Sequence, residues 1–160
     1  MKRGSFMIHK TTVKFTYEEY KRFSLTIMKK ALTKTAIGLL ILLLFAAILL
    51  GMDNSKLAAL LCAFIPLYIF MLVLKVNSQI KKTYESNELL KNTFETIDFY
   101  KNHFVSKTEK SESTVEYDKL YKIIETKTNF YLMIADNQGY IVSKANCSQE
   151  LIDFIISLKK

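Results

Sequence analysis

The sequence predicts a membrane protein of the α+β class, in which a two-helix transmembrane hairpin precedes a small antiparallel β-sheet domain closed by a C-terminal helix. Two stretches without any charged residue, 36–52 and 57–74, predict the hairpin. Short runs of alternating polar and apolar residues after residue 93 predict the sheet. The expected organisation is a strand and basic amphipathic helix at 1–34, the hairpin at 35–76, a helical extension and linker at 77–93, and a cytoplasmic domain at 94–160.

The N-terminal segment predicts a strand followed by a helix. Polar and apolar residues alternate from Ile8 to Phe15, as in a strand, and Thr16 and Glu19 have the spacing of a capping box that starts a helix at Tyr17. Apolar residues then recur at helical spacing between Tyr20 and Ala31, among several cations. This apolar stripe suits the lipid headgroup boundary and the surface of the cytoplasmic domain equally well, and both alternatives stay open.

Each uncharged stretch is long enough to cross a bilayer as a helix. Seventeen or eighteen helical residues span roughly 26 Å, and residues 35–52 and 57–75 are therefore the predicted spans. A turn of four residues at 53–56 forces the two helices to run antiparallel as neighbours. Small residues at a spacing of four predict where the helices approach, and a proline predicts a kink. The predicted packing residues are Ala47, Gly51, Ala59, Ala63 and Pro66.

The charges predict the orientation in the membrane. Residues 1–34 carry nine Lys or Arg against two Glu, whereas residues 77–160 are balanced at 12 against 12. A basic excess next to a span favours the cytoplasmic side, so both termini are expected in the cytoplasm of a bacterial cell with two spans between them. The excess also argues for anionic lipid headgroups, and against nucleic acid, as its partner. The cations expected at the lipid interface are Lys21, Arg22, Lys29, Lys30 and Lys34.

The region after residue 94 predicts a meander of about six short strands and a final helix. The strands are expected at 96–100, 104–108, 114–117, 120–126, 129–135 and 140–143. Asn146 or Ser148 can cap the helix, whose apolar face includes Leu151 and Ile155 and must lie on the sheet. A curved antiparallel sheet with such a helix at one end is the plan of a pleckstrin-homology-like domain.

Residues 115–134, together with the turn and strand at 138–144, resemble the YcxB-like family of bacterial membrane proteins. The resemblance implies an N-terminal strand and helix, two transmembrane helices and a C-terminal domain related to bacterial pleckstrin-homology folds. Ser143 departs from the proline that family members often carry at this position. The matching positions are aromatic and β-branched, and the resemblance carries over no functional residue.

The sequence offers no arrangement of residues for catalysis or for metal binding. His9 and His103 are far apart, no Cys-x-x-Cys pair is present, and four scattered glycines cannot form a phosphate-binding loop. Cys62 lies inside a predicted span and Cys147 in the cytoplasmic domain, which excludes a structural disulfide between them. A thiol enzyme built from Cys147 and His103 is the weakest of the hypotheses.

Three functions remain, and the first is favoured. It is a membrane-anchored, non-enzymatic interaction or regulatory module without cofactors, which binds a protein partner or a second copy of itself. The alternative is an immunity or envelope-stress protein that protects the membrane from a peptide or toxin, and an enzyme or transporter comes third. We also expect no dedicated headgroup pocket in the domain, because Asp98, Glu109 and Glu112 lie among the cations of its first hairpin.

Overall fold

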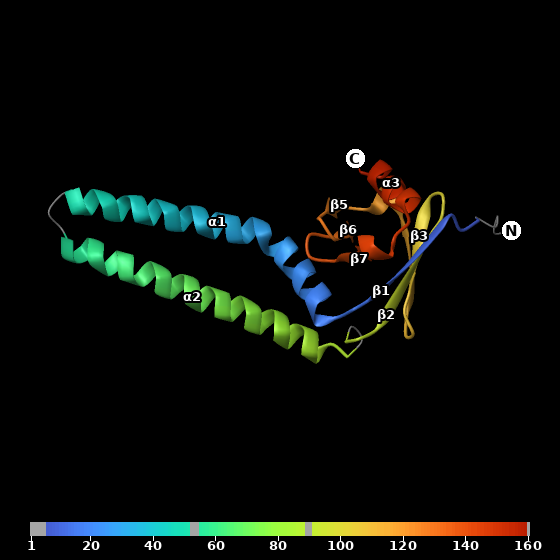
Figure 1. Cartoon of the computed structure of the whole chain (residues 1–160), viewed down its shortest axis with the longest axis horizontal. Coiled ribbons are helices and arrows are strands. Elements are labelled where there is room, and N and C mark those ends of the chain that lie inside the picture. Colours follow the sequence, from blue (N-terminus) through green and yellow to red (C-terminus); the bar gives the residue numbers. More distant parts are fainter. Residues whose placement is uncertain (1–5, 52–54, 89–90, 160) are drawn as a thin grey trace. The chain divides into compact units, whose positions relative to one another are not determined.

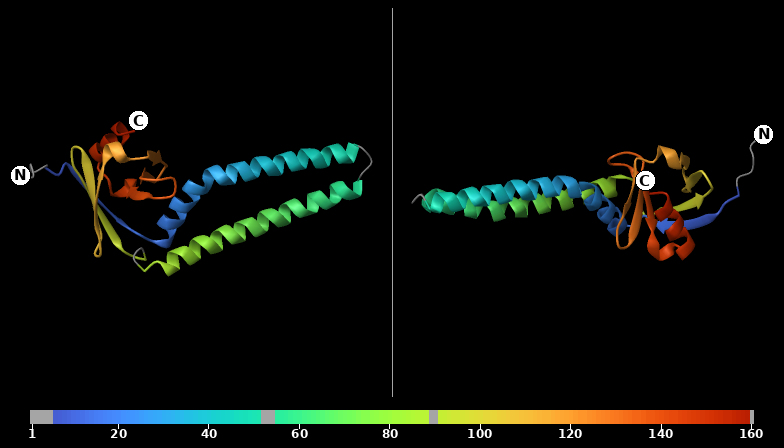
Figure 2. Two further views of the ribbon diagram at one scale, coloured as in Figure 1. Left: turned by 180° about the vertical axis from the view of Figure 1, so that it is seen from behind. Right: turned by 90° about the horizontal axis from the view of Figure 1, so that it is seen from above.

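The computed structural model describes residues 6–51, 55–88 and 91–159 of the chain. These residues form two compact units. We call them the sheet unit, made of the chain up to Phe23 together with the chain from Asn87 onward, and the hairpin unit, Ser24–Ser86. The predicted turn residues 53 and 54 lie outside the described residues. Figures 1 and 2 show the elements of both units.

The sheet unit contains two antiparallel sheets and a C-terminal helix, where the sequence predicted a single curved sheet. The first sheet has the order β1 (His9–Lys14), β2 (Phe94–Phe99), β3 (His103–Lys107) and β4 (Glu112–Glu116). The second has the order β5 (Lys122–Glu125), β6 (Asn129–Met133) and β7 (Gly139–Ser143). The remaining elements are the 3-10 turns η1 (Tyr117–Lys119) and η2 (Lys144–Asn146) and the helix α3 (Gln149–Ser157). The turn η1 lies between β4 and β5, which divides the predicted meander into two sheets.

The core of the sheet unit is assembled from both sheets and α3. Phe99 and Phe104 from the first sheet and Phe130 from the second are fully buried in one cluster. Leu151 and Ile155 of α3 belong to the same cluster, so the helix closes the core as its apolar face predicts. The helix begins at a cap, because the Ser148 hydroxyl accepts a hydrogen bond from the amide of Leu151 at 3.3 Å.

The N-terminal strand is part of this C-terminal sheet. β1 pairs with β2 along its whole length, from His9 opposite Phe99 to Lys14 opposite Phe94. The Thr11 hydroxyl donates to the carbonyl of Asn146 at 3.1 Å, and the Asn146 amide donates to the carbonyl of Thr12 at 2.7 Å. These bonds also tie β1 to the segment that follows β7. The domain is therefore discontinuous in sequence, with the hairpin inserted between its first and second strands.

The first helix, α1 (Tyr17–Gly51), begins inside the sheet unit. Phe23 is buried with its ring 5.3 Å from that of Tyr131, and the Asn129 side chain donates to a Glu19 carboxylate oxygen at 2.6 Å. All five residues of β6 are buried, because its core face meets the other sheet while Asn129 and Tyr131 meet the start of α1. The domain-facing alternative thus holds for Phe23.

Only one of the two hydrogen bonds of the predicted capping box is formed. The amide of Glu19 donates to the Thr16 hydroxyl at 3.3 Å as expected. The Glu19 carboxylate, however, bonds Asn129 and Arg22, and the Thr16 amide donates to the carbonyl of Lys14 instead. The Glu19 carboxylate thus accepts a hydrogen bond from Asn129 of β6, a residue distant in sequence, and not from the Thr16 amide at the start of the helix.

The hairpin unit consists of the rest of α1 and the helix α2 (Ser55–Ser86), which run antiparallel (Figure 1). Both are long and apolar enough to cross a membrane, with mean hydropathies of 2.4 and 2.7 in their most apolar windows. Only 6% and 11% of those windows are buried within the chain. No break separates the basic segment before residue 35 from the span, and α2 continues as a helix well past the predicted end of the second span.

The residues predicted to pack between the two helices lie on the wrong face, and the prediction is corrected here. Ala47, Gly51, Ala59, Ala63 and Pro66 are all exposed, and a Cβ atom added to Gly51 would meet no atom within 4 Å. The buried residues in this part of the hairpin are Ala46, Leu49, Ala58 and Ile65. Small residues at a spacing of four show where two helices could approach closely, but they do not show which face of each helix meets the other. The two most deeply buried residues, Ala46 and Ala58, are again small, but each precedes the predicted Ala47 or Ala59 by one position and so lies on another face of its helix.

Candidate functional site

A polar pocket of about 650 Å³ opens on the sheet unit where the β2–β3 turn meets the end of β4. Its walls come from two short segments of the chain and carry cationic, anionic, amide and phenol groups. The lining residues are Lys101, Asn102, His103, Glu116, Tyr117 and Asp118.

Backbone hydrogen bonds hold the two walls together. The amide of Tyr100 donates to the carbonyl of His103 at 2.9 Å, which closes the turn through Lys101 and Asn102. The amide of Tyr117 donates to the carbonyl of Asn102 at 3.1 Å, and the Tyr117 hydroxyl donates to the carbonyl of Tyr100 at 2.8 Å. Tyr117 thus fixes the β2–β3 turn against η1 through both its main chain and its side chain.

Aromatic stacking orients the histidine of the pocket. The rings of Tyr100 and His103 stack with centroids 4.7 Å apart and an interplanar angle of 11°. His103 lies opposite Glu116 in the register of β3 and β4. This register places an imidazole and a carboxylate on adjacent strands at the pocket wall.

Two side chains of the pocket have shifted pKa values that fix their charge at neutral pH. Burial raises the pKa of Tyr117 far above its usual value, so its phenol stays protonated at neutral pH and acts as a hydrogen-bond donor. The Lys119 ammonium, 2.7 Å from Glu116, lowers the pKa of that carboxyl through a hydrogen bond, so Glu116 is ionised. Lys101 and Asp118 add one charge of each sign. The pocket therefore presents both charges side by side.

The structure does not join the thiol and imidazole that a thiol enzyme would need. The Cys147 thiol is half-buried, donates to the carbonyl of Ser143 at 3.1 Å and lies 3.8 Å from the Thr11 hydroxyl. Burial raises the pKa of Cys147, which disfavours the reactive thiolate. Its recorded bonds go to β1 and β7, whereas His103 lines the pocket. Among the described residues, no group of three His, Cys, Asp or Glu side chains is placed to hold a metal ion.

The cations predicted at the lipid interface fall in both units. In the sheet unit, the Arg22 guanidinium bonds Glu19 at 3.0 Å, and the Lys21 ammonium lies 5.9 Å from the centre of the Tyr17 ring. In the hairpin unit, Lys29, Lys30 and Lys34 are exposed. The three hairpin lysines are thus accessible to headgroups, and Arg22 has an internal counter-ion.

The sheet unit also contains two buried carboxylates that the sequence reading missed. Glu95 lies on the core-facing side of β2, where its carboxylate accepts from the Ser106 hydroxyl at 2.5 Å. Burial raises the pKa of Glu95, and its second oxygen has no partner among the described residues. Asp98 is buried beside the Lys107 ammonium at 3.3 Å. The alternation of residues in β2 could have predicted the burial of Glu95, because Glu95 lies on the same face of the strand as Ile97 and Phe99.

Comparison with known proteins identifies the part of the chain that contains the pocket. A family model described as YcxB-like protein matches residues 99–158, which run from the end of β2 to the end of α3. No curated protein and no solved structure gives a match to the chain. The matched segment includes every residue that lines the pocket and most of the core. It also contains residues 115–134 and 138–144, on which the resemblance in the sequence rests, so the resemblance to this family is confirmed. Residues 99–158 of this chain are thus similar to the YcxB-like family.

Proposed function

We propose that the chain is a membrane-anchored, non-enzymatic interaction module of the bacterial cell membrane. The hairpin unit crosses the bilayer twice, and both termini and the sheet unit lie in the cytoplasm. The sheet unit uses its polar pocket to bind a polar segment of a protein partner or of a second copy of the chain.

Membrane anchoring is supported by the surface of the hairpin. Leu40, Phe45 and Phe70 are each more than half exposed. Surfaces of this kind need lipid as their solvent. The orientation is supported by the lysines that flank the spans, since Lys29, Lys30 and Lys34 precede the first and Lys75, Lys81 and Lys82 follow the second.

The observation that carries the binding role is the fixed polar pocket with charges of both signs. A phosphate-bearing headgroup needs several cations that converge on it, but Lys101 and His103 are accompanied here by Glu116 and Asp118. A peptide with a cation and an anion a few residues apart fits such a pocket better than a lipid headgroup. Because Tyr117 already holds both walls, little ordering accompanies binding.

The plan of the sheet unit supports a pleckstrin-homology-like assignment. A four-stranded and a three-stranded antiparallel sheet enclose the core, and α3 closes it. We propose this likeness at the level of plan only, and expect anionic lipid to be bound by the segment 1–34 and not by the part of the sheet unit that follows residue 93. Co-sedimentation of a 1–34 peptide, which lacks most of the hairpin, with anionic vesicles tests this, because neutralising Lys29, Lys30 and Lys34 should weaken its binding.

Site-specific photo-crosslinking in cells tests the pocket. A photoreactive residue at Asp118, on the pocket wall, should give one defined crosslinked product, while the same residue at Glu109, in the β3–β4 turn, should not. Lys101→Glu reverses a pocket charge and should abolish the product. Lys110→Glu is the matched control outside the pocket. Chain that is never crosslinked at Asp118, and that purifies as a monomer without a partner in mild detergent, contradicts the proposal.

Thiol labelling tests the orientation, but Cys147 is half-buried and hydrogen-bonded, and Cys62 is exposed on the hairpin unit. An exposed cysteine at Lys127, in the β5–β6 turn of a chain with Cys62→Ser and Cys147→Ser, provides a better target. An impermeant thiol reagent should label it only after the membrane is opened. Labelling of intact cells would place the sheet unit outside.

A further inference from the structure

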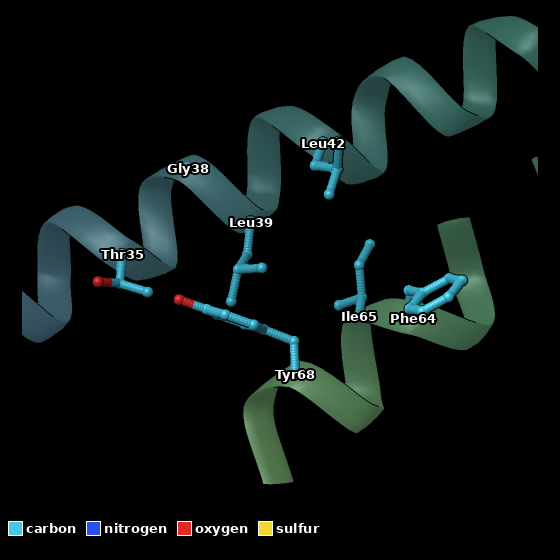
Figure 3. A pocket seen from close by; sticks show the side chains of 7 residues that line it. All are labelled: Thr35, Gly38, Leu39, Leu42, Phe64, Ile65 and Tyr68. Carbon is cyan, nitrogen blue, oxygen red and sulfur yellow. The ribbon is translucent and has the colours of Figure 1, made fainter. Parts of the chain in front are cut away.

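A groove of about 480 Å³ lies between the two helices of the hairpin unit (Figure 3). Its walls are almost entirely apolar, and its volume falls within the ~300–1,000 Å³ of ordinary small-molecule sites. A Cβ atom added to Gly38 would meet no atom within 4 Å, so the missing side chain leaves space that the chain itself does not fill. The lining residues are Thr35, Gly38, Leu39, Leu42, Phe64, Ile65 and Tyr68.

One end of the groove is polar. Figure 3 shows the Tyr68 phenol oxygen directed toward Thr35, while Leu42 and Phe64 lie toward the other end. The Thr35 hydroxyl donates to the carbonyl of Ala31 at 3.2 Å within its own helix. The Tyr68 hydroxyl is therefore the group at this end that can donate to a ligand.

Cations continue the walls of the groove beyond its polar end. Lys34 precedes Gly38 by four residues, and Lys30 precedes Lys34 by four, so both lie on the helix ridge that lines the groove. Lys75 follows Tyr68 by seven residues, two turns further along the same face of α2. A second hollow of about 460 Å³ on α2 is lined by Tyr68, Leu72 and Lys75 among others, and so links the Tyr68 end to Lys75.

We infer that this groove binds one acyl chain of an anionic phospholipid. The acyl chain lies against Leu39, Leu42 and Ile65. The ester carbonyl accepts a hydrogen bond from the Tyr68 hydroxyl, and the phosphate lies toward Lys34 and Lys75. The inference rests on the proposed membrane anchoring and is independent of the protein partner proposed for the sheet unit.

Charge complementarity selects this occupant. The described residues between Ser24 and Tyr84 include no Asp or Glu, whereas lysines flank the polar end of the groove on both helices. A second copy of the hairpin would bring the same lysines and so place like charges together. A zwitterionic lipid would offer the same acyl chain with less net attraction to these lysines.

Fluorescence quenching tests the inference, because the chain has no tryptophan. Phe64→Trp places a reporter on the groove wall of the full chain, reconstituted into vesicles that contain a minor fraction of acyl-brominated phosphatidylglycerol or acyl-brominated phosphatidylcholine. Quenching by the brominated anionic lipid should exceed quenching by the zwitterionic one, with a relative affinity of about fivefold for each lysine engaged. Lys34→Gln with Lys75→Gln should remove this preference.

Gly38→Leu fills the groove without a clash and should reduce the quenching to the level of bulk lipid. Gly51→Leu is the matched control, because it too adds a side chain into open space but lies outside the groove. Equal quenching by the two lipids, or quenching that Gly38→Leu leaves unchanged, overturns the inference. So does a dimer that Gly38→Leu dissociates, which would make a second copy the occupant. Chain that alkaline carbonate extracts from membranes would refute the membrane anchoring itself, a failure distinct from these.

Discussion

The two units place the same residue types in opposite positions. Phe99 and Phe104 of the sheet unit are fully buried, whereas Phe45 and Phe70 of the hairpin unit are 51% and 59% exposed. Conversely, the sheet unit buries carboxylates such as Glu95, while the described interior of the hairpin contains no acidic residue. With the membrane anchoring proposed above, each arrangement is stable in its own solvent, water for the sheet unit and lipid for the hairpin unit.

The largest expected difference between the units concerns the loss of an aromatic ring. Phe104→Ala should reduce the free energy of unfolding of the sheet unit by about 3–5 kcal/mol, because it removes a buried ring and leaves a cavity. Phe45→Ala, on the outer surface of the hairpin, should leave that unfolding transition unchanged. Circular dichroism of the full chain in mild detergent, followed with temperature, measures both. Similar losses for the two variants would mean that the sheet unit and hairpin unfold together.

The second largest expected difference between the units concerns the replacement of an exposed apolar residue by a charged one. Leu44→Arg puts a cation near the middle of the first span, at a cost of about 2.5–3.5 kcal/mol for insertion. Ile156→Arg, at a position of comparable exposure on α3, should change the stability by no more than about 0.5 kcal/mol. The fraction of chain that resists carbonate extraction reports insertion. Insertion of Leu44→Arg as complete as that of Ile156→Arg would mean that residue 44 does not lie in the hydrocarbon core of the bilayer.

Loss of a hydroxyl provides a smaller contrast. Ser148→Ala removes the cap of α3 and should cost about 1 kcal/mol of stability. Thr33→Ala, whose hydroxyl donates only to the carbonyl of Lys29 within α1, should be neutral or slightly favourable because alanine is the better helix former. Thermal midpoints of the two variants test this pair, and a Thr33 effect as large as that of Ser148 would contradict it.

The smallest expected effect is a dependence on pH. Because the pKa of Glu95 is raised in the folded state, the folded chain binds more protons than the unfolded chain between the unfolded and folded pKa values. The contribution of Glu95 to stability is therefore greatest below that window and declines as pH rises through it. Glu95→Gln should remove this decline and stabilise the sheet unit at pH 8 by on the order of 1 kcal/mol. Thermal midpoints at pH 5 and pH 8 measure it, and an unchanged pH slope would assign the effect to another group.

Local patterns predicted most of the elements. Hydropathy located both long helices, and alternation located the six strands after residue 93 and the apolar face of α3. Each of these patterns lies within a single segment, because the faces of a helix or strand that are apolar determine where apolar residues recur in its sequence. The burial of Glu95 follows from the same alternation, because Glu95 shares its face of β2 with Ile97 and Phe99.

Features that depend on pairing between segments were not predictable in the same way. The pocket exists because the register of β3 and β4 sets His103 opposite Glu116, and Tyr117 then reaches back to Tyr100. Nothing within either segment specifies that register. The stripe of buried residues in the hairpin likewise depends on how the two helices meet. A pattern of small residues in one helix does not show which of its faces contacts the other helix. Hence neither the pocket nor Ala46 and Ala58 appeared among the predicted site residues.

The insertion of the hairpin between β1 and β2 has a consequence for how the protein is made. Residues that pair directly in the first sheet, Lys14 and Phe94, are separated by roughly 80 residues of chain. At a synthesis rate of about 5–20 residues per second, β1 waits on the order of 4–16 seconds for its partner strand. With the hairpin in the membrane as proposed, both helices are inserted during that interval. A chain whose second helix failed to return across the membrane would leave β1 and β2 on opposite sides of it, and the first sheet could not form.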